Sequence, residues 1–176
     1  MVDQKIISAD IISAQIKIWN RLQKIVSSKH IGNAYLFSGA SGCGKEGIAL
    51  KFAQLLNCNG QSNNICGQCP SCMRFLNLQH ENLKLIFPLP TNKSAVNKKN
   101  IEIDNKDLDL VTHSIGQKSK DPFFKIQIPN ANRILIQSIR TLRKSLYLKS
   151  TLLGRRTVII FDAHFLSKGK VIGWFQ

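Results

Sequence analysis

Three observations in the sequence predict one α/β domain with an insertion. The chain has 176 residues, the length of a single domain, and 43% of them are apolar, which is enough for a packed core. A short apolar run at 34–37 leads through a glycine-rich loop into a helical run at 47–56, the order of strand, loop and helix. A further apolar strand at 158–161 ends in an acidic residue.

The composition narrows the class of protein. The formal net charge of +15 favours a polyanionic partner, although richness in lysine, asparagine and isoleucine also fits a biased composition. The first residues do not lead into the apolar core of a signal peptide, and no apolar run approaches the ~20 residues of a membrane span. We therefore expect a cytoplasmic protein with no membrane partner, whose five cysteines are reduced and available as ligands.

The amino-terminal region predicts a helix and then a loop. Apolar residues recur with helical spacing from Ala9 to Val26 and define one face of an amphipathic helix. They are Ile12, Ile16, Trp19, Leu22 and Val26. Residues 27–33 have the composition of a loop, and we expect His30 within it to be structural or solvated.

A loop of the phosphate-binding type follows the run at 34–37. Glycines let backbone N–H groups turn toward phosphate oxygens, and the N-terminus of the next helix adds partial positive charge. Lys45 adds a full charge, and Cys43 is expected to be a small filler. The candidate nucleotide-binding residues are Gly39, Ala40, Ser41, Gly42, Cys43, Gly44, Lys45 and Glu46. The alternative is a glycine-rich turn that binds nothing.

The last position of this loop departs from the usual pattern. A serine or threonine there provides a hydroxyl ligand for Mg²⁺, whereas this chain has Glu46. A carboxylate can bind Mg²⁺, but it also places a negative charge beside the phosphates. We therefore expect a loop of correct shape with impaired chemistry. ATP or ADP is its candidate ligand, and the role of Mg²⁺ stays open.

Four cysteines follow the helical run at 47–56. They are Cys58, Cys66, Cys69 and Cys72. Two consecutive gaps of two residues let neighbouring thiolates reach one tetrahedral ion. Four sulfur ligands, with no histidine and no open position, indicate a structural zinc site in a module at 57–73. The ferredoxin type of iron–sulfur cluster needs a further cysteine just after Cys72, and Arg74, Phe75 and Leu76 occupy that region. Unliganded buried thiols are the other alternative.

The middle of the chain contains secondary-structure signals but no motif of a binding site. Residues 73–78 indicate a short helix, and 83–87 a strand that prolines close. The polar stretch 91–130 predicts an insertion or a mobile loop, with a basic nucleic-acid arm as the alternative.

An apolar stripe predicts a helix over 134–148, and the residues of this stripe are Leu135, Ile139, Leu142 and Leu146. The basic residues beside the stripe indicate either a solvated face or contacts to DNA phosphates. They are Arg140, Arg143, Lys144 and Lys149.

The strand at 158–161 completes the candidate site. An acid at a strand's end positions Mg²⁺ in phosphate-loop proteins, which makes Asp162 a candidate nucleotide-site residue. Ala163 stands where an ATPase of this type has a glutamate that activates water, with His164 as the alternative base. Glu46 and Ala163 affect two separate parts of hydrolysis. Together they predict that the chain does not turn over ATP, so no catalytic residue is assigned.

These motifs, in this order, resemble the N-terminal AAA+ domain of bacterial clamp-loader subunits of DNA polymerase III. The resemblance runs from about Ala9 to Ser167 and rests on the stretch from His30 to Gly39, the phosphate loop, the cysteine module, the helix at 134–142 and the strand at 158–163. It implies an AAA+ P-loop domain with a parallel sheet flanked by helices. It also implies that the cysteine module binds zinc and that the protein acts in DNA replication.

Two subunit types of that family share this layout. The gamma/tau subunit hydrolyses ATP, with a loop ending in lysine-threonine and an Asp-Glu pair, whereas the delta-prime subunit has lost hydrolysis. Glu46 and Ala163 are closer to delta-prime. The implied partners are gamma/tau and delta in a pentameric assembly that loads the sliding clamp on primed DNA. The alternatives are an active gamma/tau-type ATPase and a zinc-containing DNA-binding module with a vestigial loop.

The carboxyl-terminal end departs from that family. Family members continue after the acid with a helix and further motifs, which the residues 168–176 do not match. We therefore expect a partial AAA+ domain over 1–176 that ends before the lid domain. Whether 168–176 is native sequence stays open.

Overall fold

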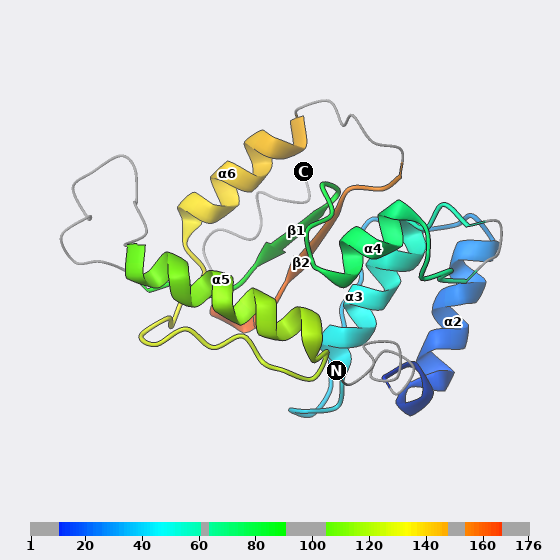
Figure 1. The fold of residues 1–176 in the computed structure, drawn as a ribbon, viewed down its shortest axis with the longest axis horizontal. Coiled ribbons are helices and arrows are strands. Elements are labelled where there is room, and N and C mark those ends of the chain that lie inside the picture. Colours follow the sequence, from blue (N-terminus) through cyan, green and yellow to red (C-terminus); the bar gives the residue numbers. More distant parts are fainter. Residues whose placement is uncertain (1–10, 61–63, 91–104, 148–153, 167–176) are drawn as a thin grey trace.

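A small parallel sheet with helices around it forms the centre of the molecule. The computed structural model describes residues 11–60, 64–90, 105–147 and 154–166. In Figure 1 the strands β1 and β2 lie at the middle, with α3 and α4 to their right and α6 to their upper left, while α5 runs below the strands to the start of α3. The helix α3 contacts β2, and α6 contacts β1. The predicted α/β class is confirmed.

The sheet pairs two segments that lie far apart in the sequence. β1 (Leu83–Ile86) and β2 (Thr157–Ile160) run parallel, with Leu83 opposite Thr157 and Ile86 opposite Ile160. β1 falls within the run 83–87 that predicted it, and β2 is shifted by one residue toward the amino terminus from the predicted strand at 158–161. Parallel pairing needs a long crossover, and here the crossover contains α5 and α6.

The predicted strand at 34–37 is wrong, because these residues form no strand in the structure. The ring of Tyr35 packs against that of Phe52 in α3, with centroids 5.0 Å apart, and Phe37 packs on the same ring at 6.5 Å. Leu36, between them, is 87% exposed. The alternate aromatic side chains therefore contact a helix, and the apolar run pairs with no neighbouring strand.

The predicted helices form, with shifted ends. They are α2 (Ile16–Ser27), α3 (Lys45–Leu56), α4 (Pro70–Leu76) and α6 (Ile136–Tyr147). Trp19 and Leu22 of α2 are buried against α3, whereas Ile16 is 47% exposed. No helix within the described ranges is long and apolar enough to cross a membrane.

A helix within the polar stretch 91–130 was not predicted. α5 (Asn105–Lys120) packs its half-buried Val111 and Ile115 against the core around the sheet, while Leu108 and Leu110 remain exposed. Because its apolar residues are divided between a buried and an exposed side, the stretch shows no clear amphipathic pattern from which a helix could be predicted. The residues 91–104, the residues 168–176, Lys149 and the start of the predicted first helix lie outside the described residues.

The core consists of three apolar clusters arranged around the sheet and α3. The first contains the sheet residues Leu83 and Ile159 with Ala53 of α3, which is fully buried. The second joins α2 to the other face of α3. The third places Ile139 and Leu142 of α6 against Ile86 of β1. The helix α3 is therefore shared between two clusters, and its two ends lead into the two candidate sites.

A buried hydrogen-bond chain joins the end of α3 to α4 and to the turn before β1. The Nδ1 atom of His80 accepts from the backbone N–H of Asn82 at 3.0 Å. Because Nδ1 accepts, the ring proton lies on Nε2, which donates to Ser71 Oγ at 2.9 Å. The Ser71 hydroxyl in turn donates to the carbonyl oxygen of Asn57 at 2.6 Å. Each group in this chain is satisfied only while His80 is neutral.

We predict that His80 makes the fold less stable in mild acid. Burial lowers the pKa of His80, so the unfolded chain binds a proton near its ordinary pKa of about 6.5 before the native chain does. The free energy of unfolding should therefore fall as the pH drops below about 6.5. Chemical unfolding at about pH 7.5 and about pH 5.5 measures this difference in wild type and in His80→Gln.

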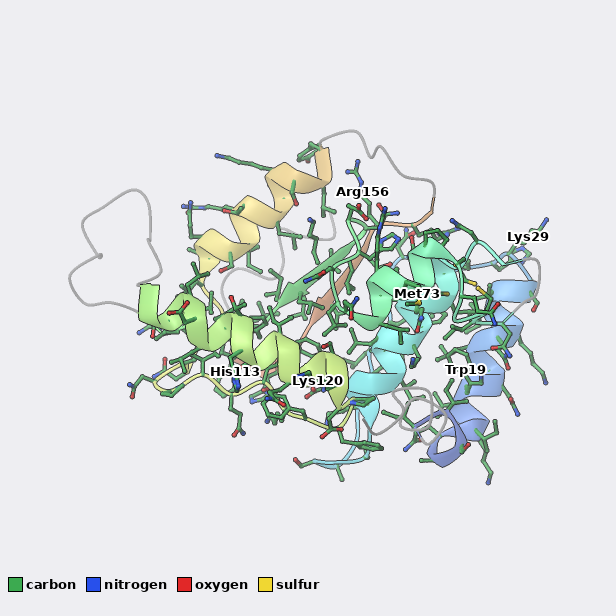
Figure 2. The ribbon with its side chains drawn as sticks, viewed as in Figure 1. Trp19, Lys29, Met73, His113, Lys120 and Arg156 are labelled. Carbon is green, nitrogen blue, oxygen red and sulfur yellow. The ribbon has the colours of Figure 1, made fainter. Side chains whose placement is uncertain are left out.

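The matched control is His113→Gln. His113 lies exposed on α5, away from the core (Figure 2), and its loss should leave the pH dependence unchanged. A His80→Gln variant that loses as much stability in acid as wild type would show that His80 is not responsible.

Candidate functional site

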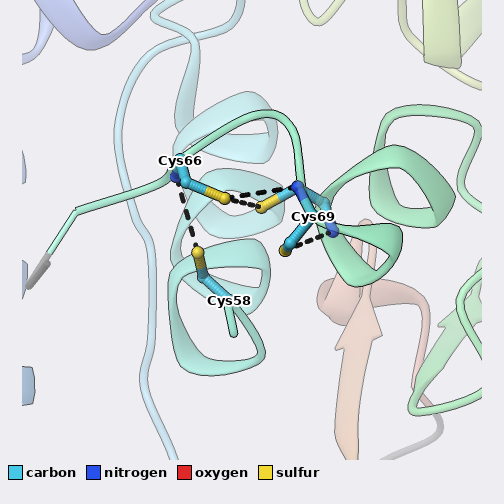
Figure 3. A group of neighbouring side chains, drawn as sticks. Cys58, Cys66 and Cys69 are labelled. Atoms are coloured by element: carbon cyan, nitrogen blue, oxygen red, sulfur yellow. Dashed lines mark hydrogen bonds between the residues drawn. The ribbon is translucent and has the colours of Figure 1, made fainter. Parts of the chain in front are cut away.

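The four predicted cysteines come together between the end of α3 and the start of α4. Cys58 follows α3, Cys66 and Cys69 lie in the connection, and their side chains point toward one another (Figure 3). With Cys72 of α4, their Sγ atoms all lie within 4.8 Å of one another. Cys72 is fully buried and the other three are half-buried. The cluster can therefore hold a metal ion.

The geometry of the sulfur atoms fits a tetrahedral metal. Zn–S bonds of about 2.3 Å separate the sulfurs of a tetrahedral site by roughly 3.8 Å. The Sγ atoms of Cys66 and Cys72 are 3.9 Å apart. The N–H groups of Cys66, Cys69 and Cys72 donate, each at 3.4 Å, to the Sγ atoms of Cys58, Cys66 and Cys69 respectively. These donors favour thiolates, which are the form that binds metal.

Cys66 and Cys72 of the cluster differ in the pKa of their thiols. The backbone N–H groups of Gln68 and Cys69 lower the pKa of Cys66 to about 6. Burial raises the pKa of Cys72, whose thiol is therefore harder to ionise than that of Cys66. A divalent cation at the centre favours the thiolate of every ligand, so binding releases protons and weakens in acid.

Local sequence sets the shape of this module. Cys69 is the N-cap of α4, and Pro70 follows at the first helical position, where its fixed φ suits the helix and its missing N–H has no cost. Gly67 has a φ of 70°, which turns the chain between Cys66 and Cys69. The two-residue gaps noted in the sequence are therefore a tight turn and the first turn of a helix.

The predicted phosphate loop lies at the start of α3, at the opposite end of α3 from the cysteine cluster. Gly42 and Gly44 have φ values of 77° and 79°, a conformation that glycine adopts without strain. The side-chain amide of Gln15 donates to the carbonyl of Cys43 at 2.7 Å, which fixes the loop to the amino-terminal segment. Ser41 and Gly42 are exposed. The loop keeps a glycine-dependent turn at a helix N-terminus.

Lys45 lies over this loop. Its Nζ donates to the carbonyl of Ala40 at 3.0 Å, across the turn. The ammonium is therefore held against the backbone of the loop.

The carboxylate of Glu46 is paired with a buried lysine. Its Oε2 lies 2.6 Å from Nζ of Lys118, near the end of α5. The Lys118 side chain is only 1% exposed, and its Nζ also donates to the carbonyls of Pro122 at 2.9 Å and Phe124 at 2.6 Å. All three protons of the ammonium therefore have an oxygen acceptor.

Asp162 is also paired with a lysine. It follows β2 and Phe161 as the N-cap residue of the short helix η2 (Ala163–Phe165), with a φ of 49°, and its Oδ1 lies 3.4 Å from Nζ of Lys125. Ala163 and His164 of this helix are exposed, with the His164 ring stacked on that of Phe165 at 4.2 Å. The structure therefore gives each predicted acidic residue of the site a lysine neighbour.

Sequence reasoning missed both lysines. Lys118 and Lys125 belong to the stretch 91–130, where lysines and acids alternate without a helical or motif signal. Lys118 is 72 residues from Glu46 along the chain, so only the folded structure reveals the pair. The basic residues Arg140, Arg143 and Lys144 of α6 are exposed. They take no part in this site.

Comparisons with known proteins identify the family. The model of the family described as "DNA polymerase III, delta subunit" matches residues 14–169. The DNA polymerase III subunits gamma/tau of Mycobacterium bovis and Mycobacterium tuberculosis are each 45% identical over 53 residues, which cover 30% of this chain and 9% of theirs. The tau/gamma subunit of Haemophilus influenzae is 40% identical over 65 residues, 36% of this chain and 9% of its own.

These alignments therefore include only a small part of the curated relatives. The comparison with solved structures gives no significant match. The family model, by contrast, extends over most of the chain, from α2 through η2. On that evidence, and as the resemblance predicted, the chain belongs to the family described as DNA polymerase III, delta subunit.

Proposed function

We propose that this chain is a clamp-loader subunit of DNA polymerase III of the delta-prime type, which does not hydrolyse ATP. Its partners are the gamma/tau and delta subunits, and through the assembly it serves to load the sliding clamp on primed DNA in the cytoplasm. The family match and the gamma/tau relatives support a role within DNA polymerase III. The α/β arrangement with a helix-capping glycine loop supports a partial AAA+ domain.

The pairing of Glu46 with Lys118 is the observation that carries the proposed lack of hydrolysis. A P-loop ATPase holds Mg²⁺ with the residue at this position and with an acid at a strand's end. Here Glu46 lies 2.6 Å from the Lys118 ammonium, and Asp162 lies 3.4 Å from that of Lys125. An acid that is already neutralised by a lysine has little attraction left for a divalent cation.

A second departure affects the attacking water. The residue after Asp162 is Ala163, which has no group to accept a proton. His164 is exposed on η2 and stacked on Phe165. The gamma/tau relatives are similar over 53 to 65 residues only, so their name does not decide between the two subunit types. The residues Glu46 and Ala163 favour the non-hydrolysing one.

The cysteine module gives the proposed subunit a rigid surface. Cys58, Cys66, Cys69 and Cys72 would hold Zn²⁺, which supplies a fixed cross-link and no reaction. The ion would join the end of α3 to the start of α4, two elements already linked through Ser71. A surface fixed in this way can contact a neighbouring subunit without ordering a loop.

We predict that the chain alone releases phosphate from ATP no faster than buffer, with or without Mg²⁺. Mixed with gamma/tau and delta subunits, it should enter a complex on size exclusion. That complex should hydrolyse ATP equally fast whether it contains wild type or Lys45→Ala, because turnover belongs to the other subunits.

Two outcomes would contradict this proposal. Mg²⁺-dependent phosphate release by the isolated chain, lost in Lys45→Ala, would make it an active ATPase of the gamma/tau type. Failure of the wild-type chain to bind either partner subunit would argue against a clamp-loader role.

We also predict one zinc per chain. Elemental analysis of protein purified without added metal should give about one equivalent, and Cys72→Ser should lower it to a small fraction. Removal of zinc by a chelator should reduce the melting temperature by roughly 10 °C, because metal binding is coupled to folding.

The matched control is Cys43→Ser. Cys43 lies in the phosphate loop and is not part of the cysteine cluster, so this variant should retain full zinc content. Equal metal content and stability in Cys72→Ser and Cys43→Ser would disprove a zinc site at the cluster.

A further inference from the structure

One short segment supplies both of the lysines that pair with Glu46 and Asp162. Lys118 lies at the end of α5 and Lys125 in the connection that follows it. In Figure 1 this end of α5 lies beside the start of α3, and Lys120, labelled in Figure 2, lies there too. The segment 118–125 therefore brings two positive charges to Glu46 and Asp162.

The surroundings of Lys118 resemble a cation site filled by an ammonium. Three oxygens surround its Nζ at 2.6 to 2.9 Å, and one of them belongs to the Glu46 carboxylate. Its Nζ also lies 5.7 Å from the centroid of the Phe161 ring, beside the end of β2. The side chain is among the most buried in the described part of the chain. A buried lysine of this kind is stable only because every proton has an acceptor and the charge has a partner.

The segment also covers the first turn of α3. A Cβ atom placed on Gly44 would lie 3.2 Å from a ring carbon of Phe123, and one placed on Gly47 would lie 3.1 Å from Cβ of Pro122. Glycine at these positions leaves room both for this segment and for the side chain of Ile11, which is the nearest neighbour of Gly47. The ion pair of Lys118 and the close approach of Pro122 and Phe123 therefore hold the segment 118–125 on the start of α3.

We propose that Lys118 is a resident cation which replaces the divalent metal at this loop. Its ammonium neutralises the residue at the metal-binding position and ties α5 to α3, so the loop keeps its shape without Mg²⁺. Any nucleotide phosphate that binds there does so without a divalent ion, with Lys45 as its cation. This inference deepens the proposed function and rests on its loss of hydrolysis.

The test removes the ammonium and asks whether a metal takes its place. Lys118→Ala leaves the Glu46 carboxylate and two carbonyls facing a vacated space. Its melting temperature should fall by about 10 °C, as expected when one partner of a buried pair is removed. Millimolar Mg²⁺ should restore a large part of that loss. The wild-type melting temperature should not respond to Mg²⁺.

Two further variants distinguish the loss of the Lys118 ammonium from a general loss of packing. Lys120→Ala removes an exposed lysine two residues away and should behave as wild type. Glu46→Gln combined with Lys118→Ala should be destabilised without any response to Mg²⁺, because the carboxylate is gone. An equal melting temperature for Lys118→Ala and Lys120→Ala would overturn the proposal, as would a destabilised Lys118→Ala that ignores Mg²⁺.

If Lys118→Ala does not fold, the response of the wild-type melting temperature to Mg²⁺ tests the proposal. Stabilisation of wild type by Mg²⁺ that is lost in Glu46→Gln would place a metal at Glu46 and overturn the proposal, whereas no response in either protein supports it. All these measurements are made without nucleotide or partner subunits. A failure of the Lys118 proposal would therefore appear in these melting temperatures. A failure of the proposed function would appear instead in the assays of phosphate release and complex formation.

Discussion

The ion pair between Lys118 and Glu46 is the interaction that holds α5 on the start of α3, next to the glycine-rich loop. It joins α5 to the first turn of α3 at 2.6 Å, and Lys118 is nearly inaccessible to solvent. Breaking a buried pair by removing one partner costs about 3–5 kcal/mol, because the other charge is left uncompensated. The position that gives an ATPase its metal ligand thus gives this chain a link between two helices.

α3 is fixed at both of its ends by polar contacts, while apolar clusters hold its sides. At its start are the glycine loop and Glu46, and beyond its end are Asn57 and Cys58 with the cysteine cluster. A single rigid helix therefore connects the candidate zinc module to the candidate nucleotide loop. Such an arrangement suits a subunit whose contribution to an assembly is its shape, because neither end requires turnover of a ligand.

Much of this fold could be predicted, since apolar spacing alone gave four helices and both paired strands. The run 34–37 was misread because four apolar residues can pack on a helix as well as pair in a sheet, and Tyr35 and Phe37 contact Phe52. The cysteine cluster was evident from spacing, which is local. Lys118 was not, because a lysine is buried only where distant segments supply acceptors, and its partner Glu46 is 72 residues away.

The central claim is that a lysine, and not a metal, neutralises the acid at the metal position of this loop. The most direct measurement is anomalous diffraction from crystals of the wild-type chain soaked with Mn²⁺ and ADP. The account predicts no manganese near Glu46 and the Lys118 ammonium within hydrogen-bond distance of its carboxylate. A manganese ion bound between Glu46 and a phosphate oxygen, with Lys118 displaced, would contradict it.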